Sequence, residues 1–210
     1  MSQKSPAIFI ADSAALNFLN SIATPVDTTI DWISDGEGLL AWLQQAQLVP
    51  REALEAVRRL AKPAELDRVA AQARNLREWF RTFVQENKGR PLRAAALADL
   101  EPLNRLLASD EGFGQLVAHK HGKTTALQFQ SSRRWRSPES LLLPIAEALA
   151  KMLAEEDLTD VKACEGATCT LVFADRTRGR SRRWCSMEIC GNRAKQTAHR
   201  LRLKGSRNRR

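Results

Sequence analysis

Apolar residues recur at spacings of three and four along most of the first 158 residues, and this period predicts a mainly helical region. The clearest case follows Pro63, where six apolar side chains keep these spacings and predict a long helix that ends before Gly89. Pro102 predicts a bend in a later helix. The further helices are expected at 13–22, from 35, at 50–61, at 94–108 and from 137 to about 156.

The pattern changes to alternation at two places in this region. Residues 28–33 are β-prone and predict a short extended piece. Residues 115–120 and 124–131 predict two strands joined by a turn around Gly122. The expected fold class is therefore α+β, mainly α. A helical N-terminal domain with a β-hairpin would cover residues 1–158 and fold without the rest of the chain.

The length and the apolar content suit one ordinary domain with a small appendage. The chain has 210 residues, and 43% of them are hydrophobic, which is enough for a packed core. The apolar stretch at 7–19 is interrupted by polar residues, and it has neither the charged start nor the cleavage site of a signal peptide. With no apolar run of membrane-spanning length, we expect a cytoplasmic protein that has no membrane partner.

The four cysteines form the strongest chemical signal. Cys164, Cys169, Cys185 and Cys190 make two C-x4-C pairs separated by fifteen residues. In a reducing compartment such a cluster is more typical of a metal site than of two disulfides. Zinc prefers four tetrahedral ligands, and cysteine thiolates are its usual structural partners. Disulfides, an iron–sulfur cluster and unliganded thiols are the alternatives.

One structural zinc ion is the favoured interpretation, because the surrounding segment has few apolar side chains. A unit of about fifty residues with so small a core needs a metal to supply stability that burial cannot. The residues between the cysteine pairs predict a hairpin in which 170–173 is one strand and 182–185 returns beside it. The second domain is therefore placed at 160–210. Four thiolates leave zinc no open position, which argues against catalysis by the metal.

Charge is distributed unevenly along the chain. The formal net charge is +9, and the segment from Lys162 to Arg210 carries +11 against −2 for the remainder. This asymmetry predicts a polyanionic partner for the C-terminal segment alone. A helix after Cys190 is expected to bury a stripe of Ala194, Ala198 and Leu201 and to expose cations around it. The candidate nucleic-acid-binding residues are Arg176, Arg178, Arg180, Arg182, Arg183, Arg193, Lys195, Arg200, Arg202 and Lys204.

A plainer interpretation is a solvated helix whose cations balance the negative charge of a four-thiolate site. That role needs one or two arginines, and the surplus of eleven positive charges exceeds it. In the N-terminal domain, Arg74, Arg77 and Arg81 recur on one side of the long helix. They form a candidate clamp for an acidic small-molecule ligand, with a solvated helix face as the alternative.

The cysteine segment resembles the CGNR zinc-finger family. The residues that carry this resemblance are the run 182–187, Phe173, Asp175 and Cys190-Gly191-Asn192-Arg193 with Lys195. Fingers of this family follow an N-terminal domain called ABATE, which residues 16–20, 31–32 and 40–43 resemble. The resemblance implies a bacterial, stress-responsive transcription regulator. Its finger would bind DNA, and its ABATE domain would sense a ligand or signal.

The sequence thus predicts a DNA-binding transcription regulator with an N-terminal sensing domain. An RNA-binding or ribosome-associated zinc protein is the second hypothesis, because basic zinc modules of this size serve there as well. An enzyme acting on nucleic acid is the third. No serine-hydrolase, zinc-protease or paired-carboxylate motif occurs in the chain, and we therefore expect no enzymatic activity.

Overall fold

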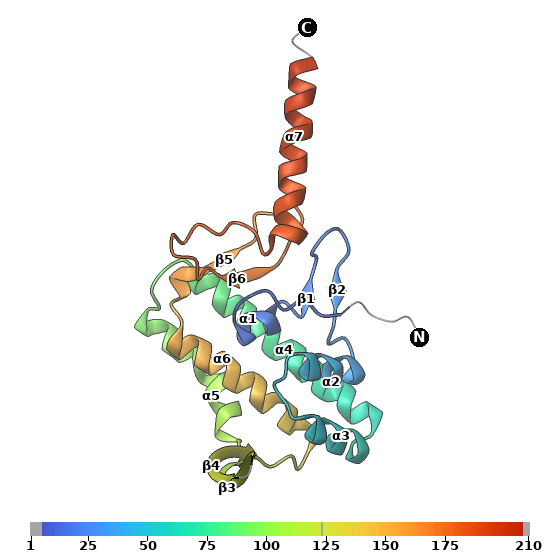
Figure 1. Cartoon of the computed structure of the whole chain (residues 1–210), viewed down its shortest axis with the longest axis vertical. Helices are drawn as coiled ribbons and strands as arrows, with labels where there is room; N and C mark the ends of the chain where they lie inside the picture. Colours follow the sequence, from blue (N-terminus) through green and yellow to red (C-terminus); the bar gives the residue numbers. More distant parts are fainter. Residues whose placement is uncertain (1–5, 123, 208–210) are drawn as a thin grey trace.

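The computed structural model describes residues 6–122 and 124–207, apart from the side chains of 120, 121 and 203–207. Lys204, one of the predicted nucleic-acid contacts, therefore has a described backbone and no described side chain. The N-terminal region is a bundle of helices from which one long hairpin projects, and the cysteine segment covers one end of the bundle (Figure 1). The predicted fold class, α+β and mainly α, is confirmed.

Seven α-helices and six strands make up the regular structure of the described residues. The helices are α1 Ala14–Leu19, α2 Gly36–Gln45, α3 Arg51–Leu60, α4 Pro63–Asn87, α5 Glu101–Ala108, α6 Leu143–Glu155 and α7 Asn192–Arg207. The strands are β1 Ile22–Ala23, β2 Ile30–Asp31, β3 Gly112–His121, β4 Thr124–Arg133, β5 Val161–Ala163 and β6 Val172–Ala174. Short 3-10 helices are η1 Ala94–Leu100, η2 Pro138–Leu142 and η3 Leu158–Asp160, and η4 Met187–Gly191 is a π-helical turn.

Helix α4 is the longest element and the spine of the N-terminal bundle. Pro63 occupies its first turn, where a missing N–H is harmless, and Glu65 accepts a hydrogen bond from the N–H of Lys62 at 2.7 Å. Its apolar face is buried, as the spacing predicted. No helix in the described part of the chain is long and apolar enough to cross a membrane.

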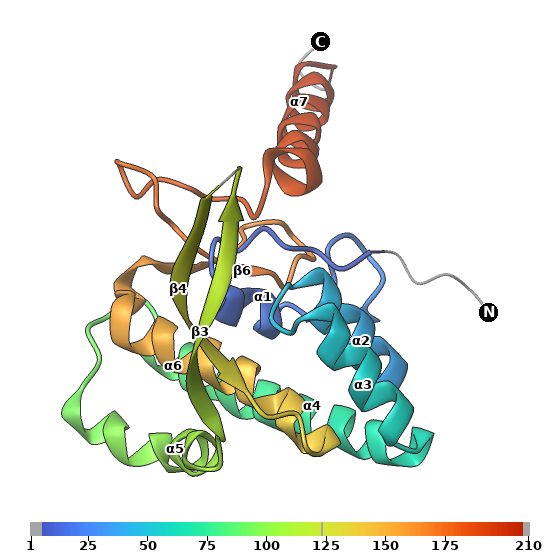
Figure 2. The same cartoon turned by 60° about the horizontal axis from the view of Figure 1, so that its bottom comes forward.

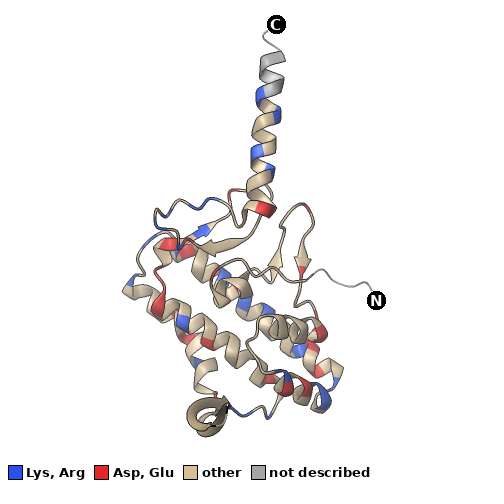
Figure 3. Cartoon of the chain, viewed as in Figure 1, with Lys and Arg blue, Asp and Glu red and all other residues tan. Residues whose placement is uncertain are grey.

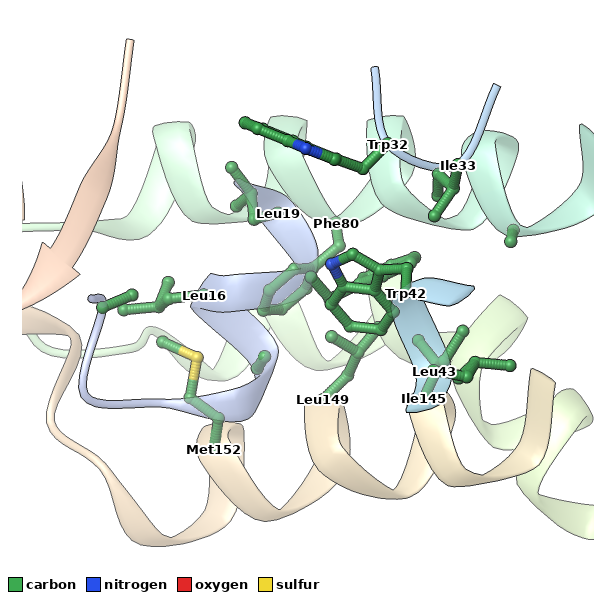
Figure 4. Close-up of a cluster of buried hydrophobic side chains, with 14 of the residues drawn as sticks. Leu16, Leu19, Trp32, Ile33, Trp42, Leu43, Phe80, Ile145, Leu149 and Met152 are labelled. Atoms are coloured by element: carbon green, nitrogen blue, oxygen red, sulfur yellow. The ribbon is translucent and has the colours of Figure 1, made fainter. Parts of the chain in front are cut away.

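The core lies where α1, α2, α4 and α6 meet. Figure 4 shows Trp42, Phe80 and Leu149 packed together from three of these helices. The rings of Phe18 and Trp42 meet edge to face with centroids 5.6 Å apart. Helix α2 approaches α4 so closely that a Cβ on Gly36 would lie 2.4 Å from the Cβ of Leu66. Only glycine fits this crossing.

The predicted helices are present, with differences at their ends. Helix α1 stops at Leu19, and Ile22, which the period placed on its apolar face, belongs to β1 instead. Strand β1 pairs with β2 in the region predicted to be extended. The single helix expected at 94–108 is divided into η1 and α5, and the helix expected from 137 begins as η2 before α6. Pairing with Asp31 takes Ile22 out of α1, and Pro102 and Pro144 occupy the first turns of α5 and α6, where the missing N–H of proline is tolerated.

The predicted β-hairpin is confirmed and is longer than expected. Strands β3 and β4 pair antiparallel from Gly112↔Arg133 to His121↔Thr124. Figure 1 looks along this hairpin, and Figure 2 shows it at full length in front of the helices. At its base, Arg133 donates two hydrogen bonds to Asp110 and one to Glu147, which fixes the hairpin to α6. Leu116, Leu127 and Phe129 are exposed on it.

The cysteine-bearing unit, residues 160–207, is not separate from the bundle. Strand β6 pairs with β5 on one edge and lies against α1 on the other side, and Leu171 and Phe173 are fully buried in the common core. A fragment ending near residue 157 would leave this face of α1 uncovered. Burial of the shared face contributes to the stability of both parts, and the expectation that residues 1–158 fold alone stays a prediction.

The strand predicted at 170–173 in the cysteine unit pairs with a different segment from the one expected. Residues 182–185 were expected to return beside 170–173, but β6 pairs with β5, which precedes the first cysteine. The chain turns back through the loop that carries the first cysteine pair, and Cys164 donates its N–H to Leu171 at 2.9 Å. Residues 182–185 form no strand; the N–H of Arg182 donates to the Asp175 carboxylate, and the carbonyl of Arg183 accepts from the N–H of Glu165.

Candidate metal centre and nucleic-acid interface

The fold brings the four cysteines to one point. Cys164 and Cys169 lie in the loop between β5 and β6, Cys185 lies in the segment before η4, and Cys190 lies within η4. Their sulfur atoms are all within 4.8 Å of one another, and the Cys169 and Cys185 Sγ atoms are 3.9 Å apart. Zinc bound tetrahedrally by thiolates at about 2.3 Å separates its sulfur ligands by roughly 3.8 Å. The four thiols are unbridged, and their spacing fits this ion.

Local hydrogen bonds and one close approach shape the first cysteine loop. The N–H groups of Gly166 and Cys185 donate to the Cys164 sulfur at 3.4 and 3.3 Å. Such bonds offset part of the negative charge that thiolates bring to a metal. A Cβ on Gly166 would lie 2.9 Å from the Cys190 sulfur. Glycine at this position is therefore what lets the loop close around the centre.

The second cysteine pair is positioned by a capped turn. Ser186 accepts a hydrogen bond from the N–H of Ile189 at 2.9 Å, which starts the η4 turn. Cys190 is near the end of that turn, and α7 follows directly. The fourth ligand and the basic helix therefore share one rigid connection. Any movement of α7 at its base would displace a metal ligand.

The thiols perturb one another strongly. A hydrogen bond with Cys185 lowers the pKa of Cys169 to about 5, and the same bond together with burial raises the pKa of Cys185. Burial raises the pKa of Cys190 to about 12. The thiols cannot all ionise at this spacing unless a cation lies among them. The sulfur-only donor set suits zinc.

Asp175 organises the basic loop beside the metal centre, which is the segment 176–183 that carries five arginines. Its buried carboxylate accepts from Lys162 Nζ at 2.7 Å, from both the N–H and the hydroxyl of Thr177, and from the N–H of Arg182 at 2.9 Å. Burial alone would raise the pKa of Asp175, but these donors hold it well below its ordinary value. The sequence singled out Asp175 only through the family resemblance.

The basic loop differs from its predicted role in part. Arg182 is not a free nucleic-acid contact: its guanidinium pairs with Asp12, donates to the carbonyl of Ile10 at 2.9 Å and lies 4.2 Å from the Phe173 ring centroid. These contacts join the cysteine unit to the N-terminal segment. The prediction that Arg182 binds nucleic acid is corrected on this ground, because its donors are already engaged inside the protein.

The neighbouring loop arginines form ion pairs at the surface. Arg176 pairs with Glu156, Arg180 with Asp160 and Arg183 with Glu165. Exposed pairs of this kind are weak, and a phosphate can compete for them. Arg178 is exposed and has no partner among the described residues. Of the five loop arginines, Arg178 is thus the most readily available to an anion.

Helix α7 extends from the metal centre away from the body (Figure 1). Its described cations form no ion pair, its sequence contains no Asp or Glu, and Figure 3 shows basic positions along its described part. Lys195, Arg200 and Arg202 are exposed, and Arg193 at the base is half-buried. The expected buried stripe is wrong: Ala198 is exposed and Leu201 is 65% exposed, because the first cysteine loop borders a hollow on this side of the helix and does not cover it.

The arginines of α4 do not form the expected clamp. Arg77 is only 2% exposed, and its guanidinium is bound by Asp31, Glu78 and the Ser21 hydroxyl. Arg74 donates to the carbonyls of Ile33 and Ser34. The prediction is corrected for these two residues, since their donors hold the β1–β2 region against α4. Arg81 pairs with Glu78 and lines a cavity that also includes residues of the cysteine unit.

Two contacts between the units were missed from the sequence. Asn20 bonds through its side-chain amide to the backbone of Val172, and Asp12 pairs with Arg182. Each joins residues more than 150 positions apart. Polar residues near helix ends are usually interpreted as caps, and nothing local distinguishes these two from that role.

Comparison with known families agrees with this architecture. The sequence model of the ABATE family, described as "Putative stress-induced transcription regulator", matches residues 12–156, and that of the CGNR zinc finger matches 161–203. No curated protein matches the chain significantly. The clustered cysteines lie within the second match and form its zinc-binding site. The chain is therefore a zinc-binding regulator that belongs to the ABATE family and carries a C-terminal CGNR zinc finger.

Proposed function

We propose that this protein is a DNA-binding transcription regulator in which one structural zinc ion holds α7 and the basic loop for contact with duplex DNA. The N-terminal domain receives the signal that sets this activity. The role of the zinc ion is structural and not catalytic, because four cysteine ligands leave it no open coordination position. The residues that would hold the ion are Cys164, Cys169, Cys185 and Cys190.

The observation that carries the proposal is the isolation of α7. Helix α7 has sixteen residues and no acidic one, and the cations whose side chains the structure describes, Arg193, Lys195, Arg200 and Arg202, are unpaired. An isolated helix of this length and polarity gains little stability in water by itself. Contact with a polyanion supplies the missing interactions, and the release of condensed counterions drives the association.

The cations of α7 lie on two opposite sides of the helix. Arg193 and Arg200 are seven positions apart and share a face, and Lys195 and Arg202 share another. The two faces are about 140–180° apart at 100° per residue. A helix roughly 10–12 Å wide fits a B-DNA major groove of about 12 Å. Both rows of cations would then reach the phosphates that border the groove.

A third face of α7 is left for the bases. Ala194, Thr197 and Leu201 line a hollow of about 320 Å³ together with the first cysteine loop, so this side of the helix base faces the protein. Gln196 and His199 lie on the other side and are exposed. A glutamine side chain can make two hydrogen bonds to adenine in the major groove. We assign Gln196 as the residue that reads sequence.

The same geometry favours DNA over the alternative of RNA. Double-stranded RNA has a deep, narrow major groove that side chains cannot read. A free-standing helix with cations on opposite sides therefore has no matching site on an RNA duplex. Recognition of single-stranded RNA would instead need exposed aromatic side chains. Helix α7 has none.

In vitro selection from a random duplex library, followed by affinity measurements on the selected site, tests the proposal. We expect the site to bind at least tenfold more tightly than structured RNA. The double variant Arg200→Ala/Arg202→Ala should lose at least thirtyfold in affinity, while Arg59→Ala/Arg93→Ala, which removes two exposed cations elsewhere, should bind normally. Gln196→Ala should relax the preference at one position. Preferential binding of RNA, or equal binding by both double variants, would refute the proposal.

A further inference from the structure

A cavity of about 530 Å³ lies at the junction of the two units. Its walls come from the second half of α4, the β1–β2 hairpin and the β5–β6 hairpin of the finger. Its volume is in the range of small-molecule sites, and junctions between domains are common places for such sites. The buried side chains of Leu19, Val84 and Val172 give it an apolar floor.

The polar part of the cavity carries one uncompensated positive charge. Glu78 accepts from Arg77 and from Arg81, and Asp31 pairs with Arg77, so these four charges balance. Lys88, at the end of α4, has no carboxylate partner in the described part of the chain. Arg81 donates through Nε to Glu78 and through one terminal nitrogen to the Leu19 carbonyl, and its other terminal nitrogen has no described partner.

Hydroxyl groups complete the lining. Thr24 and Thr29 on the β1–β2 hairpin are joined through their hydroxyls at 2.7 Å, and Thr170 of the finger accepts from the N–H of Thr24 at 2.8 Å. These groups can exchange their present partners for a ligand. The cavity therefore combines an apolar floor, a wall of hydroxyl groups and one unpaired cation. This combination suits a small molecule that has one anionic end and one apolar body.

We propose that this cavity binds a small amphipathic monocarboxylate. The carboxylate is held by Lys88 and by the free nitrogen of Arg81, and the apolar body rests on Leu19, Val84 and Val172. A second negative charge would lie beside Glu78 and would be repelled. The expected ligand is therefore a carboxylic acid with a single charge and not a diacid or a phosphate ester.

Binding of the acid in this cavity would act on the contact between the N-terminal domain and the zinc finger. The β1–β2 connection touches the finger near its zinc site, since the Thr168 hydroxyl donates to the Val26 carbonyl and the Cys190 sulfur lies 4.0 Å from the Pro25 carbonyl. A ligand that contacts both α4 and the finger would stabilise this arrangement and hence the base of α7. Only this regulatory step rests on the proposed DNA-binding function; the binding of the acid does not.

The test uses full-length, zinc-loaded protein with 4-phenylbutyrate as the probe and 4-phenylbutyramide as its neutral counterpart. Titration calorimetry should show the acid binding about tenfold more tightly than the amide, and amide NMR signals of Lys88 and Thr170 should shift. Lys88→Gln should weaken binding of the acid about tenfold and leave binding of the amide unchanged. Arg59→Gln, which removes an exposed cation outside the cavity, is the matched control and should bind normally.

A second variant tests the location without altering charge. Gln85 is exposed and lines the cavity, so Gln85→Trp fills the space while α4 remains intact and should abolish binding of both compounds. No binding of the acid at 10 mM, equal affinity for acid and amide, or unchanged affinity in both variants would overturn the assignment. DNA binding by the ligand-free protein is measured separately, so a failure of the DNA proposal leaves this result interpretable.

Discussion

The side-chain amide of Asn20 makes two buried hydrogen bonds with the backbone of Val172, donating to its carbonyl at 2.8 Å and accepting from its N–H at 3.0 Å. Asn20 follows α1 of the ABATE domain, and Val172 begins β6 of the zinc finger. The free edge of β6 is thereby occupied, and Ala174 completes it by donating to the carbonyl of Ala11 at 3.0 Å. The finger's strand is thus joined to the ABATE domain as part of one core.

Replacing Asn20 tests this connection. Asn20→Ala leaves a buried N–H and a buried carbonyl of Val172 without partners, and each orphaned group costs about 1–3 kcal/mol. We therefore expect the free energy of unfolding to fall by roughly 2–4 kcal/mol in denaturant titrations. Asn104→Ala, at an exposed position of α5, is the control and should stay within about 0.5 kcal/mol of the wild type. A small effect at Asn20 would mean that the two units are held together by other contacts.

Removal of zinc should affect more than the finger. The purified protein should contain one zinc ion per chain, and Cys185→Ser should lose it. Because β6 covers α1, both the variant and chelation should lower the unfolding temperature of the N-terminal domain as well as unfold the finger. Metal analysis and far-UV circular dichroism measure the two effects. Iron with visible absorbance, or an N-terminal domain that melts unchanged after chelation, would contradict this account.

The depressed pKa of Asp175 predicts a pH dependence of stability. Because the folded-state pKa lies below the unfolded value of about 3.9, the stabilisation is complete above roughly pH 5 and is lost as pH falls through the folded-state pKa. Asp175→Asn should destabilise the protein by about 2–4 kcal/mol at pH 7, because Lys162 loses a buried charged partner.

Acid also releases zinc, and therefore the comparison between the two proteins is the measurement. The difference in unfolding free energy between wild type and Asp175→Asn should shrink as pH falls from 5 towards 3. A difference that stays constant, or that grows towards low pH, would show that Asp175 is not ionised in the folded protein.

Arg182 and Arg178 should separate stability from nucleic-acid binding. Arg182→Ala removes the pair with Asp12 and the contact with the Phe173 ring, and should lower the free energy of unfolding by about 2 kcal/mol. Arg178→Ala should leave the unfolding free energy unchanged within about 0.5 kcal/mol and weaken binding to DNA. Thermal denaturation and DNA affinity of both variants test these two roles. A stability loss in Arg178→Ala together with an affinity loss alone in Arg182→Ala would reverse them.

Much of the architecture could be predicted from the sequence because its signals are local. The period after Pro63, the alternation around Gly122 and the spacing of the four cysteines each depend on neighbouring residues, and each indicated the right kind of element. The pairing of β6 with β5 could not be predicted in this way. It depends on how the Cys164–Cys169 loop folds back, which is a matter of three-dimensional closure around the centre.

The roles of individual arginines could not be predicted from the sequence either. Charge counts place Arg77, Arg182 and Arg200 in one class, although the first two are enclosed by carboxylates and carbonyls from distant segments and the third is exposed. Their partners Asp31 and Asp12 are separated from them by 46 and 170 positions. Only the packing of the whole chain brings these charges together. The excess charge of a segment therefore does not identify which of its arginines are available for contact.

The salt dependence of DNA affinity tests the central claim, that α7 is the DNA-binding element, most directly. If about four cations from α7 and the loop reach phosphates, the logarithm of affinity should fall with the logarithm of salt at a slope of about −3 to −4. Arg200→Ala should reduce the magnitude of that slope by about one and weaken binding similarly on all sequences. DNA-binding titrations at salt concentrations between about 50 and 300 mM measure both the slope and the loss of affinity. Salt-insensitive binding, or an unchanged slope after loss of Arg200, would contradict the account.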